Sequence, residues 1–178
     1  MKKRLYPLSF LFITIALFTV SCEVLDEAMK DRTKEEEMKK LQYVFTVNEI
    51  IDYPRANGLE REIPSFNGKL LWINVNTFIH SRDIEEIKKL PSEKKGFYDL
   101  QLKLTRRGRI MWTALTEQVR VTKFGVIIDG VFYRTFEPER IPKPEEAEWA
   151  AVKGPFDAVT ADGLIKYAKS NFKHFQKD

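Results

Sequence analysis

The sequence predicts an α+β fold, in which helices pack on one face of a mixed or antiparallel sheet. Three observations carry this prediction. Strand and helix patterns alternate along the first half of the domain, and an apolar hairpin sequence follows them. An amphipathic segment of helical period near the end of the chain adds a further helix that can cover the sheet.

The first two strands are expected at residues 42–47 and 70–75, which are rich in β-branched, aromatic and other apolar side chains. Asn57, Gly58 and Pro64 lie between these two segments. Because glycine and proline interrupt regular structure, they mark this part of the chain as irregular. We therefore expect two strands joined by an irregular connection.

A short helix is expected next. Ser81 is a residue type that caps helices, and Asp83 would stand in the first turn. The apolar face of this helix would comprise Ile84, Ile87 and Leu90. A spacing of three residues is typical of one face of a helix, which is why we predict a helix here.

The pattern then returns to a strand. Residues 98–104 alternate apolar and polar side chains, which is typical of a strand with one face in water. Thr105 follows and can cap another helix. The buried stripe of that helix is expected at Ile110, Met111, Ala114 and Leu115.

Residues 124–133 give the strongest local pattern in the chain. An apolar strand runs into Asp129 and Gly130, and a second apolar strand follows. Glycine after aspartate supplies the positive φ that a two-residue type I′ turn requires. We therefore interpret Asp129 and Gly130 as a structural turn. The alternative is that Asp129 faces a ligand from the hairpin tip.

The end of the chain predicts one more strand and one more helix. A loop with prolines at 138, 142 and 144 leads to a short strand at 148–153. Asp157 then caps an amphipathic helix, with Lys169 and Lys173 placed favourably near its C-terminal end. The apolar face of this helix comprises Val159, Ala161, Leu164, Ile165, Ala168 and Phe172.

The first 22 residues resemble a bacterial lipoprotein signal. Three basic residues follow Met1, an apolar run covers residues 5–20, and Ser21 precedes Cys22, the only cysteine. As a helix the run would span about 24 Å, less than the roughly 30 Å of a bilayer core, so we expect cleavage and not a stable span. Residues 1–21 are thus predicted to be a signal peptide and Cys22 to be lipidated. The alternative is an ordinary secretory signal with an accidental cysteine.

The signal-peptide assignment changes how the net charge of the chain is interpreted. Three of the 30 basic residues lie in the signal and none of the 26 acidic ones do, so the remaining chain carries a formal charge of +1 instead of +4. Basicity therefore gives no reason to expect nucleic acid as a partner. Acyl chains on Cys22 would make membrane lipid a partner, and would hold the domain in the bacterial envelope, facing the periplasm or the cell exterior.

Residues 22–40 are dense in both charge signs and contain neither glycine nor proline. We interpret this segment as a tether behind the lipidated cysteine. The alternative is a docking helix that uses Val24, Leu25, Ala28 and Met29. Residues 41–178 are expected to form one domain of about 138 residues, which is enough for a single hydrophobic core.

Four motifs in order resemble the periplasmic head region of the protein-export factor SecD. They are Leu-Lys-Leu-Thr-Arg-Arg-Gly at 102–108, Ala-Leu-Thr at 114–116, Val-Ile-Ile-Asp-Gly-Val at 126–131, and Gly-Pro-Phe-Asp at 154–157 followed by Ala161 and Leu164. The resemblance implies a SecD head-like α+β fold on a lipoprotein and a link to protein export.

The resemblance has two limits. Residues 133–136 stand where the family commonly has Ser-Ala-Pro, so the surface there is expected to differ. SecD family members also draw on the proton gradient through a bundle of membrane helices, and this sequence carries no such bundle. We therefore do not expect a proton-driven export motor.

The sequence offers few groups for catalysis. Its two histidines, His80 and His174, form no metal-binding pattern. It contains no Gly-x-Ser-x-Gly motif for a nucleophile and no glycine pattern that cradles phosphate. Its adjacent glutamates lie in polar stretches, which is typical of a solvated face. We expect no enzymatic activity, no cofactor and no metal site, and keep an enzyme as a third hypothesis.

Three arginines indicate one candidate binding surface. Arg106, Arg107 and Arg109 cluster where a helix is expected to start, and the helix dipole opposes positive charge at that end. Such a placement indicates an anionic partner or a lipid headgroup. The alternative is simple surface charge.

Three aromatic residues indicate another candidate surface. Tyr133, Phe136 and Trp149 lie near the hairpin and the proline loop, and their exposure would create an apolar groove for an extended peptide. We therefore predict a membrane-anchored module that binds polypeptide or a partner envelope protein. The SecD resemblance links that role to export. The alternative is a structural scaffold lipoprotein of an envelope complex without an export role.

Overall fold

The computed structural model describes residues 41–55, 58–118, 122–141 and 148–177. The expected signal peptide, the expected lipidated cysteine and the expected tether all lie outside these described residues. Leu41–Asp178 form one compact unit. Within its described part, no helix is long and apolar enough to cross a membrane.

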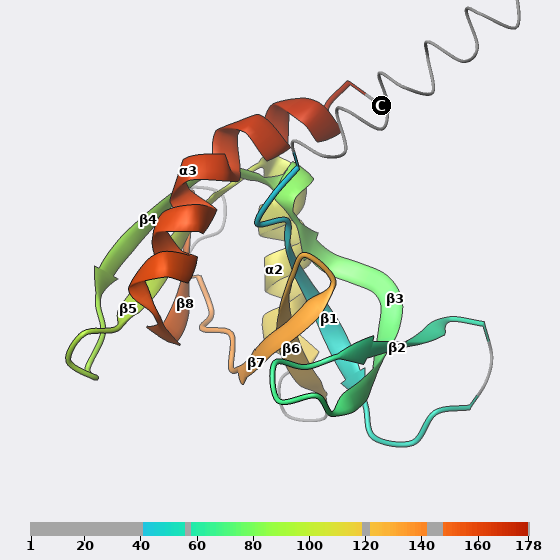
Figure 1. The fold of residues 1–178 in the computed structure, drawn as a ribbon. Coiled ribbons are helices and arrows are strands. Elements are labelled where there is room, and N and C mark those ends of the chain that lie inside the picture. The colour runs from blue at the N-terminus through green and yellow to red at the C-terminus, as the bar shows by residue number, and fades with distance from the viewer. Residues whose placement is uncertain (1–40, 56–57, 119–121, 142–147, 178) are drawn as a thin grey trace, which may run out of the picture. The chain divides into compact units, whose positions relative to one another are not determined.

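The described chain contains eight strands, two α-helices and one short 3₁₀ helix (Figure 1). In chain order these elements are β1 (Phe45–Ile51), β2 (Glu60–Pro64), β3 (Leu70–His80), η1 (Ser81–Asp83), β4 (Ile84–Pro91), β5 (Tyr98–Leu104), α2 (Arg106–Gln118), β6 (Lys123–Ile128), β7 (Val131–Phe136), β8 (Trp149–Phe156) and α3 (Ala158–Phe175).

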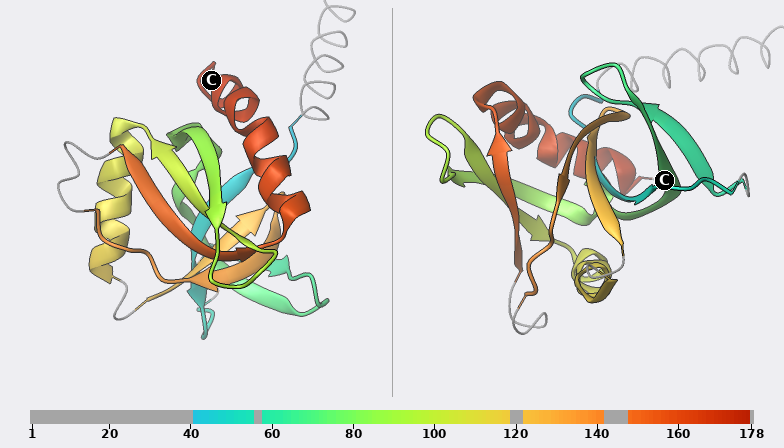
Figure 2. Two further views of the ribbon diagram at one scale, coloured as in Figure 1. Left: turned by 90° about the vertical axis from the view of Figure 1, so that its left-hand side faces the viewer. Right: turned by 90° about the horizontal axis from the view of Figure 1, so that it is seen from below.

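The strands of the described residues form two sheets, and neighbouring strands are antiparallel in both. The larger sheet has the order β2-β3-β1-β6-β7, and the smaller one has the order β4-β5-β8. Helix α3 packs along β4, whereas α2 lies against β3 and β5 (Figures 1 and 2). The predicted α+β class with antiparallel strands is therefore confirmed, and the division into two sheets adds to it.

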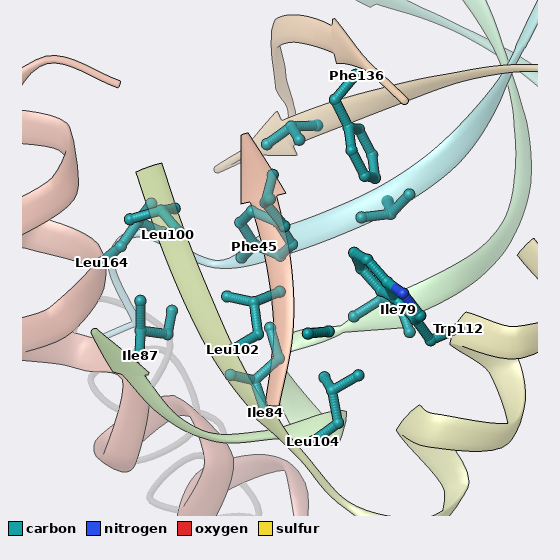
Figure 3. Packing of buried hydrophobic residues seen from close by; sticks show 14 of the residues in the cluster. Phe45, Ile79, Ile84, Ile87, Leu100, Leu102, Leu104, Trp112, Phe136 and Leu164 are labelled. Atoms are coloured by element: carbon teal, nitrogen blue, oxygen red, sulfur yellow. The ribbon is translucent and has the colours of Figure 1, made fainter. Parts of the chain in front are cut away.

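One hydrophobic core joins the two sheets and both helices (Figure 3). Strand β5 contributes Leu100, Leu102 and Leu104, which are at most 1% exposed, so the predicted alternation of this strand is confirmed. Phe45 from β1 and Trp112 from α2 are fully buried in the same cluster. Burial of such a side chain contributes roughly 1.5–3 kcal/mol, so this cluster is the main source of stability.

The Asp-Gly hairpin is confirmed. Strands β6 and β7 pair on either side of Asp129 and Gly130, whose φ angles are 52° and 79°. Both are positive, as a type I′ turn requires. Asp129 also does something that the sequence did not reveal. Its carboxylate accepts the backbone N–H groups of Tyr43 at 2.9 Å and Val44 at 2.7 Å, which ties the start of the domain to the hairpin tip.

The short helix predicted over residues 81–90 is wrong. Only Ser81–Asp83 form a helical turn, and the chain then continues as strand β4. A β-bulge near the start of β4 shifts its register, so Ile84 and Ile87 are both buried although they are three residues apart. The bulge thus reproduces the spacing of a helix. Leu90, the third residue of the predicted apolar face, is 43% exposed.

Four strands also differ from the prediction. Strand β1 was expected at residues 42–47 but spans Phe45–Ile51. Strand β2 forms where an irregular connection was expected, because the first residues of β3, 70–74, offer it a partner. Strand β3 continues beyond its predicted end at residue 75 as far as His80, where it pairs with β1. Pro64 is the last residue of β2, an edge strand, where proline removes no essential hydrogen bond. Strand β8 continues beyond its predicted end as far as Phe156.

Helix α2 begins as predicted but buries another face. The Thr105 hydroxyl accepts the Gly108 N–H at 3.1 Å, which confirms the cap. Gly108, Trp112 and Leu115 are the buried residues of the helix, whereas Ile110 is 62% exposed. The predicted stripe is therefore confirmed at Leu115 and in part at Met111, which packs half-buried against the core, and is wrong at Ile110, while Ala114 is half-buried. Trp112 occupies the centre of the true stripe, one turn after Gly108.

Helix α3 follows the prediction closely. The Asp157 carboxylate caps it by accepting the Thr160 N–H at 2.9 Å. Its buried residues are Ala161, Leu164, Ala168 and Asn171. Val159, which was expected on the apolar face, is exposed.

Candidate functional site

A groove of about 680 Å³ lies between the two sheets, at the edge formed by β7 and β8. Arg134, Thr135 and Phe136 of β7 line one wall, and Lys153 and Gly154 of β8 line the other. Local sequence explains the first wall, because the Asp-Gly turn returns the chain as β7. The second wall exists because β8 pairs with β5 of the smaller sheet.

Each wall is an edge of its sheet within the described residues. Strand β7 pairs with β6, apart from one isolated bridge between Phe132 and Ser65, and β8 pairs with β5. The outer side of an edge strand presents backbone N–H and C=O groups that can pair with a further strand. The groove therefore brings two sheet edges to one place.

Arg134 spans the groove from one wall to the other. Its Nη1 donates to the Pro155 carbonyl at 3.3 Å, and its Nε donates to the Thr135 carbonyl at 3.1 Å. Burial lowers the pKa of the guanidinium from its ordinary value. Arg134 makes no ion pair with any described residue, so several of its five N–H groups remain for a ligand.

The two lysines of the groove are paired with carboxylates, whereas Glu137, which also lines it, makes no ion pair with a described residue. Lys123 Nζ lies 2.7 Å from Asp52, and Lys153 Nζ lies 2.5 Å from Glu139. Hydrogen bonds to these carboxylates raise the pKa of both lysines. The apolar side chain of Phe136 is 7% exposed and contributes to the floor. The groove thus combines an apolar floor, two paired lysines, and a guanidinium and a carboxylate, those of Arg134 and Glu137, that are not in ion pairs.

The structure does not bring the three predicted aromatic residues together. Tyr133 stacks on Phe156 at 5.2 Å, and its hydroxyl donates to the Asp157 carboxylate at 2.9 Å, while burial raises its pKa. Phe136 packs against Trp112 in the core. Trp149 lies at the opposite end of β8 from Phe156, about 23 Å along the strand at a rise of ~3.3 Å per residue.

The expected apolar surface of Tyr133, Phe136 and Trp149 is therefore corrected. Trp149 is half-buried beside Lys88, whose Nζ lies 4.0 Å from the ring centroid. Of the three, only Phe136 lines the groove. The wall residues Arg134 and Thr135 were not singled out as binding residues. They do fall in the segment 133–136, where the sequence departs from the SecD pattern, and that departure could have drawn attention to them.

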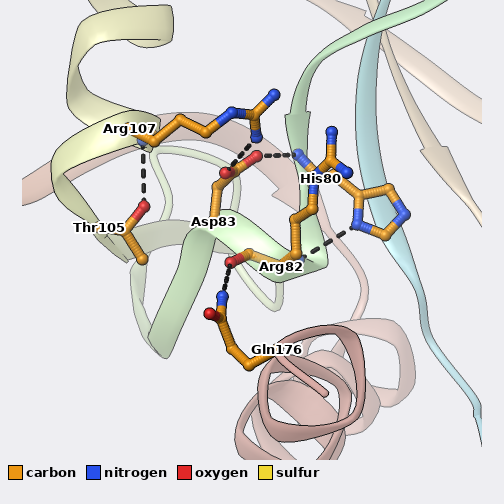
Figure 4. A network of polar contacts seen from close by, with 7 residues as sticks. His80, Arg82, Asp83, Thr105, Arg107 and Gln176 are labelled. Atoms are coloured by element: carbon orange, nitrogen blue, oxygen red, sulfur yellow. Dashed lines mark hydrogen bonds and ion pairs between the residues drawn. The ribbon is translucent and has the colours of Figure 1, made fainter. Parts of the chain in front are cut away.

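Two of the three predicted arginines, Arg106 and Arg107, line a second depression, of about 520 Å³. Arg107 Nη1 contacts the buried Asp83 carboxylate at 2.5 Å (Figure 4). Arg106 is exposed and also lines the depression. Arg109 points elsewhere, since its Nη1 lies 3.5 Å from the Leu104 carbonyl. The structure thus brings Arg106 and Arg107 together and leaves Arg109 out.

Asp83 organises this second region. Its carboxylate accepts the His80 N–H at 3.1 Å as well as the Arg107 guanidinium (Figure 4). The His80 ring in turn accepts the Arg82 N–H at Nδ1, at 3.1 Å. Burial lowers the pKa of His80 from 6.5, and the charge of Arg82 lowers it further. Among the described residues, no group of three or more His, Cys, Asp or Glu could hold a metal ion.

Comparison with known proteins gives a fold likeness only. No protein-family model matches the chain, and no curated protein matches it. The chain is similar to a solved structure of SecDF, described as a membrane component that enhances protein export, with 14% identity and a TM-score of 0.48, covering 79% of this chain and 68% of that one. It is also similar to SecDF in a super-membrane-facing form, with 15% identity and a TM-score of 0.48, covering 78% of this chain and 20% of that one.

Proposed function

We propose that this protein is a lipid-anchored, non-enzymatic binding module of the bacterial envelope, and that the groove between β7 and β8 binds an extended polypeptide segment. The observation that carries the proposal is the convergence of two sheet edges on one groove. An extended chain can add to such an edge as a further strand.

The groove supports this mode of binding in two ways. Backbone hydrogen bonds to β7 or β8 would hold a segment of almost any sequence, because they involve no side chain of the ligand. The Arg134 guanidinium would add a charge-assisted bond to a ligand carbonyl or carboxylate, and the apolar floor at Phe136 would accept alternate side chains. Affinity would thus come from the backbone, and selectivity from a few contacts.

Two features of the sequence support a cellular location and a role for this protein. The segment that ends at Cys22 and resembles a lipoprotein signal favours anchorage in a membrane of the envelope. The SecD-like motifs, which begin at residue 102, favour a role accessory to protein export. The partner is accordingly an unfolded polypeptide or an envelope protein with an extended segment.

Anchorage is tested at Cys22. We expect the wild-type protein to incorporate labelled fatty acid, and Cys22→Ala to abolish the label and leave a larger precursor. Both are read by gel electrophoresis of labelled cells. A wild-type protein without label would refute lipidation while leaving the groove proposal open.

Polypeptide binding is tested with the full-length protein in nanodiscs of neutral lipid. The probe is a labelled, permanently unfolded polypeptide, and its binding is followed by fluorescence anisotropy. We expect Arg134→Ala to weaken binding by about tenfold, as loss of one charge-assisted hydrogen bond implies. Arg61→Ala is the matched control, because Arg61 is exposed on β2, away from the groove.

Hydrogen exchange then locates the ligand. Strand addition should slow amide exchange in β7 or β8 when the polypeptide is present. Binding without such protection, or equal binding by both arginine variants, would show that the groove is not the site. Absence of any binding, together with stable purification in a fixed ratio with one envelope protein, would favour the scaffold alternative.

A further inference from the structure

The exposed face of α3 carries a row of lysines. Lys166, Lys169 and Lys173 recur at spacings of three and four residues, so they lie on one side of the helix, and Lys177 continues the row in the following turn. All four are exposed. The opposite side of α3 carries the buried residues that face the core.

The one acidic residue of α3, Asp162, lies one turn before Lys166 on the same face, but its ion pair is with Lys89 of β4 and not with a lysine of the row. The sequence from residue 163 to residue 177 contains no aspartate or glutamate. Four lysines elsewhere in the described domain pair with acids, among them Lys89 with Asp162 at 2.5 Å and Lys103 with Glu148 at 3.4 Å. None of the ion pairs among the described residues involves a lysine of the α3 row. The row therefore gathers four cations on one face of α3 that have no ion-pair partner among the described residues, although Lys169 and Lys173 also complement the negative end of the helix dipole.

The arginine depression extends this field to the flank of α3. Phe172, Phe175 and Gln176 of the helix end form one side of it, and Arg82 and Arg106 belong to the other side. Gln176 Nε2 donates to the Arg82 carbonyl at 3.1 Å, which fixes the two sides together (Figure 4). Arg106 stands in the first turn of α2, where the helix dipole adds to its charge. The depression is thus suited to a phosphate group.

The start of the described chain runs along the same helix. The Gln42 carbonyl accepts the Asn171 amide at 2.8 Å, and the Tyr43 ring stacks on Tyr167 at 5.8 Å. Any anchor that precedes residue 41 is therefore joined to the domain beside α3. This step rests on the anchorage proposed above, which would keep α3 close to a membrane surface.

We infer that the lysine row of α3, together with Arg82 and Arg106, docks the domain on the anionic headgroups of the membrane that holds the chain. Each basic residue close to an anionic surface strengthens its attraction by about fivefold, so three lysines contribute on the order of a hundredfold. Such docking would give the β7–β8 groove a defined orientation relative to the membrane, which a lipid anchor alone would not impose.

The test uses the full-length protein in nanodiscs of phosphatidylcholine, with or without phosphatidylglycerol. Lysine acetylation is followed residue by residue by mass spectrometry. We expect Lys166, Lys169, Lys173 and Lys177 to react at least about threefold more slowly in the anionic discs, and the difference to vanish near 1 M salt, where the Debye length is ~3 Å. Lys69, Lys94 and Lys95 should react equally in both.

Charge variants complete the test. A triple variant with Lys169→Gln, Lys173→Gln and Lys177→Gln should remove the protection of Lys166 and of the two arginines, the latter read with phenylglyoxal. The control triple variant, with Lys69→Gln, Lys94→Gln and Lys95→Gln, changes the charge equally and should retain it. Circular dichroism checks that both remain folded.

Three results would overturn the inference: equal acetylation in the two kinds of disc, equal effects of the two triple variants, or protection of α3 by a soluble acidic protein or nucleic acid and not by anionic lipid. A failure of anchorage would appear separately, as loss of the protein from neutral discs. A failure of the groove proposal would appear only in the polypeptide-binding assay.

Discussion

The hairpin tip between β6 and β7 and the corner between β3 and β4 both redirect the chain, but they are held in different ways. At the tip, Asp129 and Gly130 adopt positive φ angles, and the chain reverses within two residues. The corner at Ser81–Asp83 carries the chain from the larger sheet to the smaller one. The tip forms by local backbone preference and is tied to one distant segment, Tyr43 and Val44, through Asp129, whereas the corner depends on partners that come from several other parts of the sequence.

Those partners come from three elements. The buried Ser81 hydroxyl accepts the Phe45 N–H of β1 at 2.8 Å. Asp83 pairs with Arg107 of α2, and the Arg82 carbonyl accepts the side-chain amide of Gln176, just after α3. The corner can therefore form only when β1, α2 and α3 are in place. The comparison teaches that the route between the sheets is a product of tertiary packing.

The largest expected effect tests the strand that follows the corner. Ile87→Ala should lower the free energy of unfolding by about 2–5 kcal/mol, because Ile87 is 4% exposed and packs in the main core. Leu90→Ala is the matched control, and its effect should stay within about 0.5 kcal/mol because Leu90 is 43% exposed and lies outside the buried core cluster. Urea denaturation measures both. Equal losses for the two variants would instead fit a helix that buries both residues.

A smaller effect is expected at the hairpin tip. A Cβ atom at Gly130 would meet nothing within 4 Å, so the cost of a side chain there is purely conformational. Gly130→Val should destabilise the protein by ~1 kcal/mol or more, whereas Gly130→Asn should cost less because asparagine tolerates positive φ. Thermal melting followed by circular dichroism compares the two. Identical melting temperatures for both variants and the wild type would contradict the positive φ of this turn.

The smallest effect is a pH dependence at the corner. Burial lowers the pKa of His80 from 6.5 in the folded protein, so below pH 6.5 the unfolded chain binds a proton that the folded chain resists. Stability should therefore fall as the pH decreases from about 7.5 to 5.5, by less than about 1 kcal/mol from this group. His80→Asn, which retains an acceptor for the Arg82 N–H, should reduce that fall. Urea denaturation at about pH 7.5 and about pH 5.5 measures the free energy of unfolding of both proteins. An equal fall in that free energy for the variant and the wild type would assign the pH dependence to other groups.

The parts of the fold that were predicted are those with a local cause. The Asp-Gly turn, the Thr105 and Asp157 caps and the alternation of residues 98–104 each depend on residues close together in the sequence, and all are present in the structure. The predicted helix at residues 81–90 failed because a bulge in β4 gave a strand the apolar spacing of a helix.

The candidate site was predicted only in part. Periodicity indicated that β7 and β8 exist, and Phe136 was among the residues expected to bind. The groove itself depends on how the strands divide between two sheets, which leaves β7 and β8 as edges. Tyr133 and Trp149 were assigned to one surface because they lie near the same loop. In the structure Trp149 is the first residue of β8, whereas Tyr133 stacks on Phe156, the last residue of that strand.

The sequence by itself determined the α+β class, the hairpin, both helix starts and the alternation of the central strand, because each follows from backbone preference or from the period of apolar residues. Only the tertiary structure decided which strands became edges, where the corner joined the two sheets, and which cations lacked a carboxylate partner. Sheet pairing and ion pairing join residues that are tens of positions apart, as Arg107 and Asp83 or Lys89 and Asp162 show. Such choices depend on the distances that the whole fold sets, which no local pattern encodes.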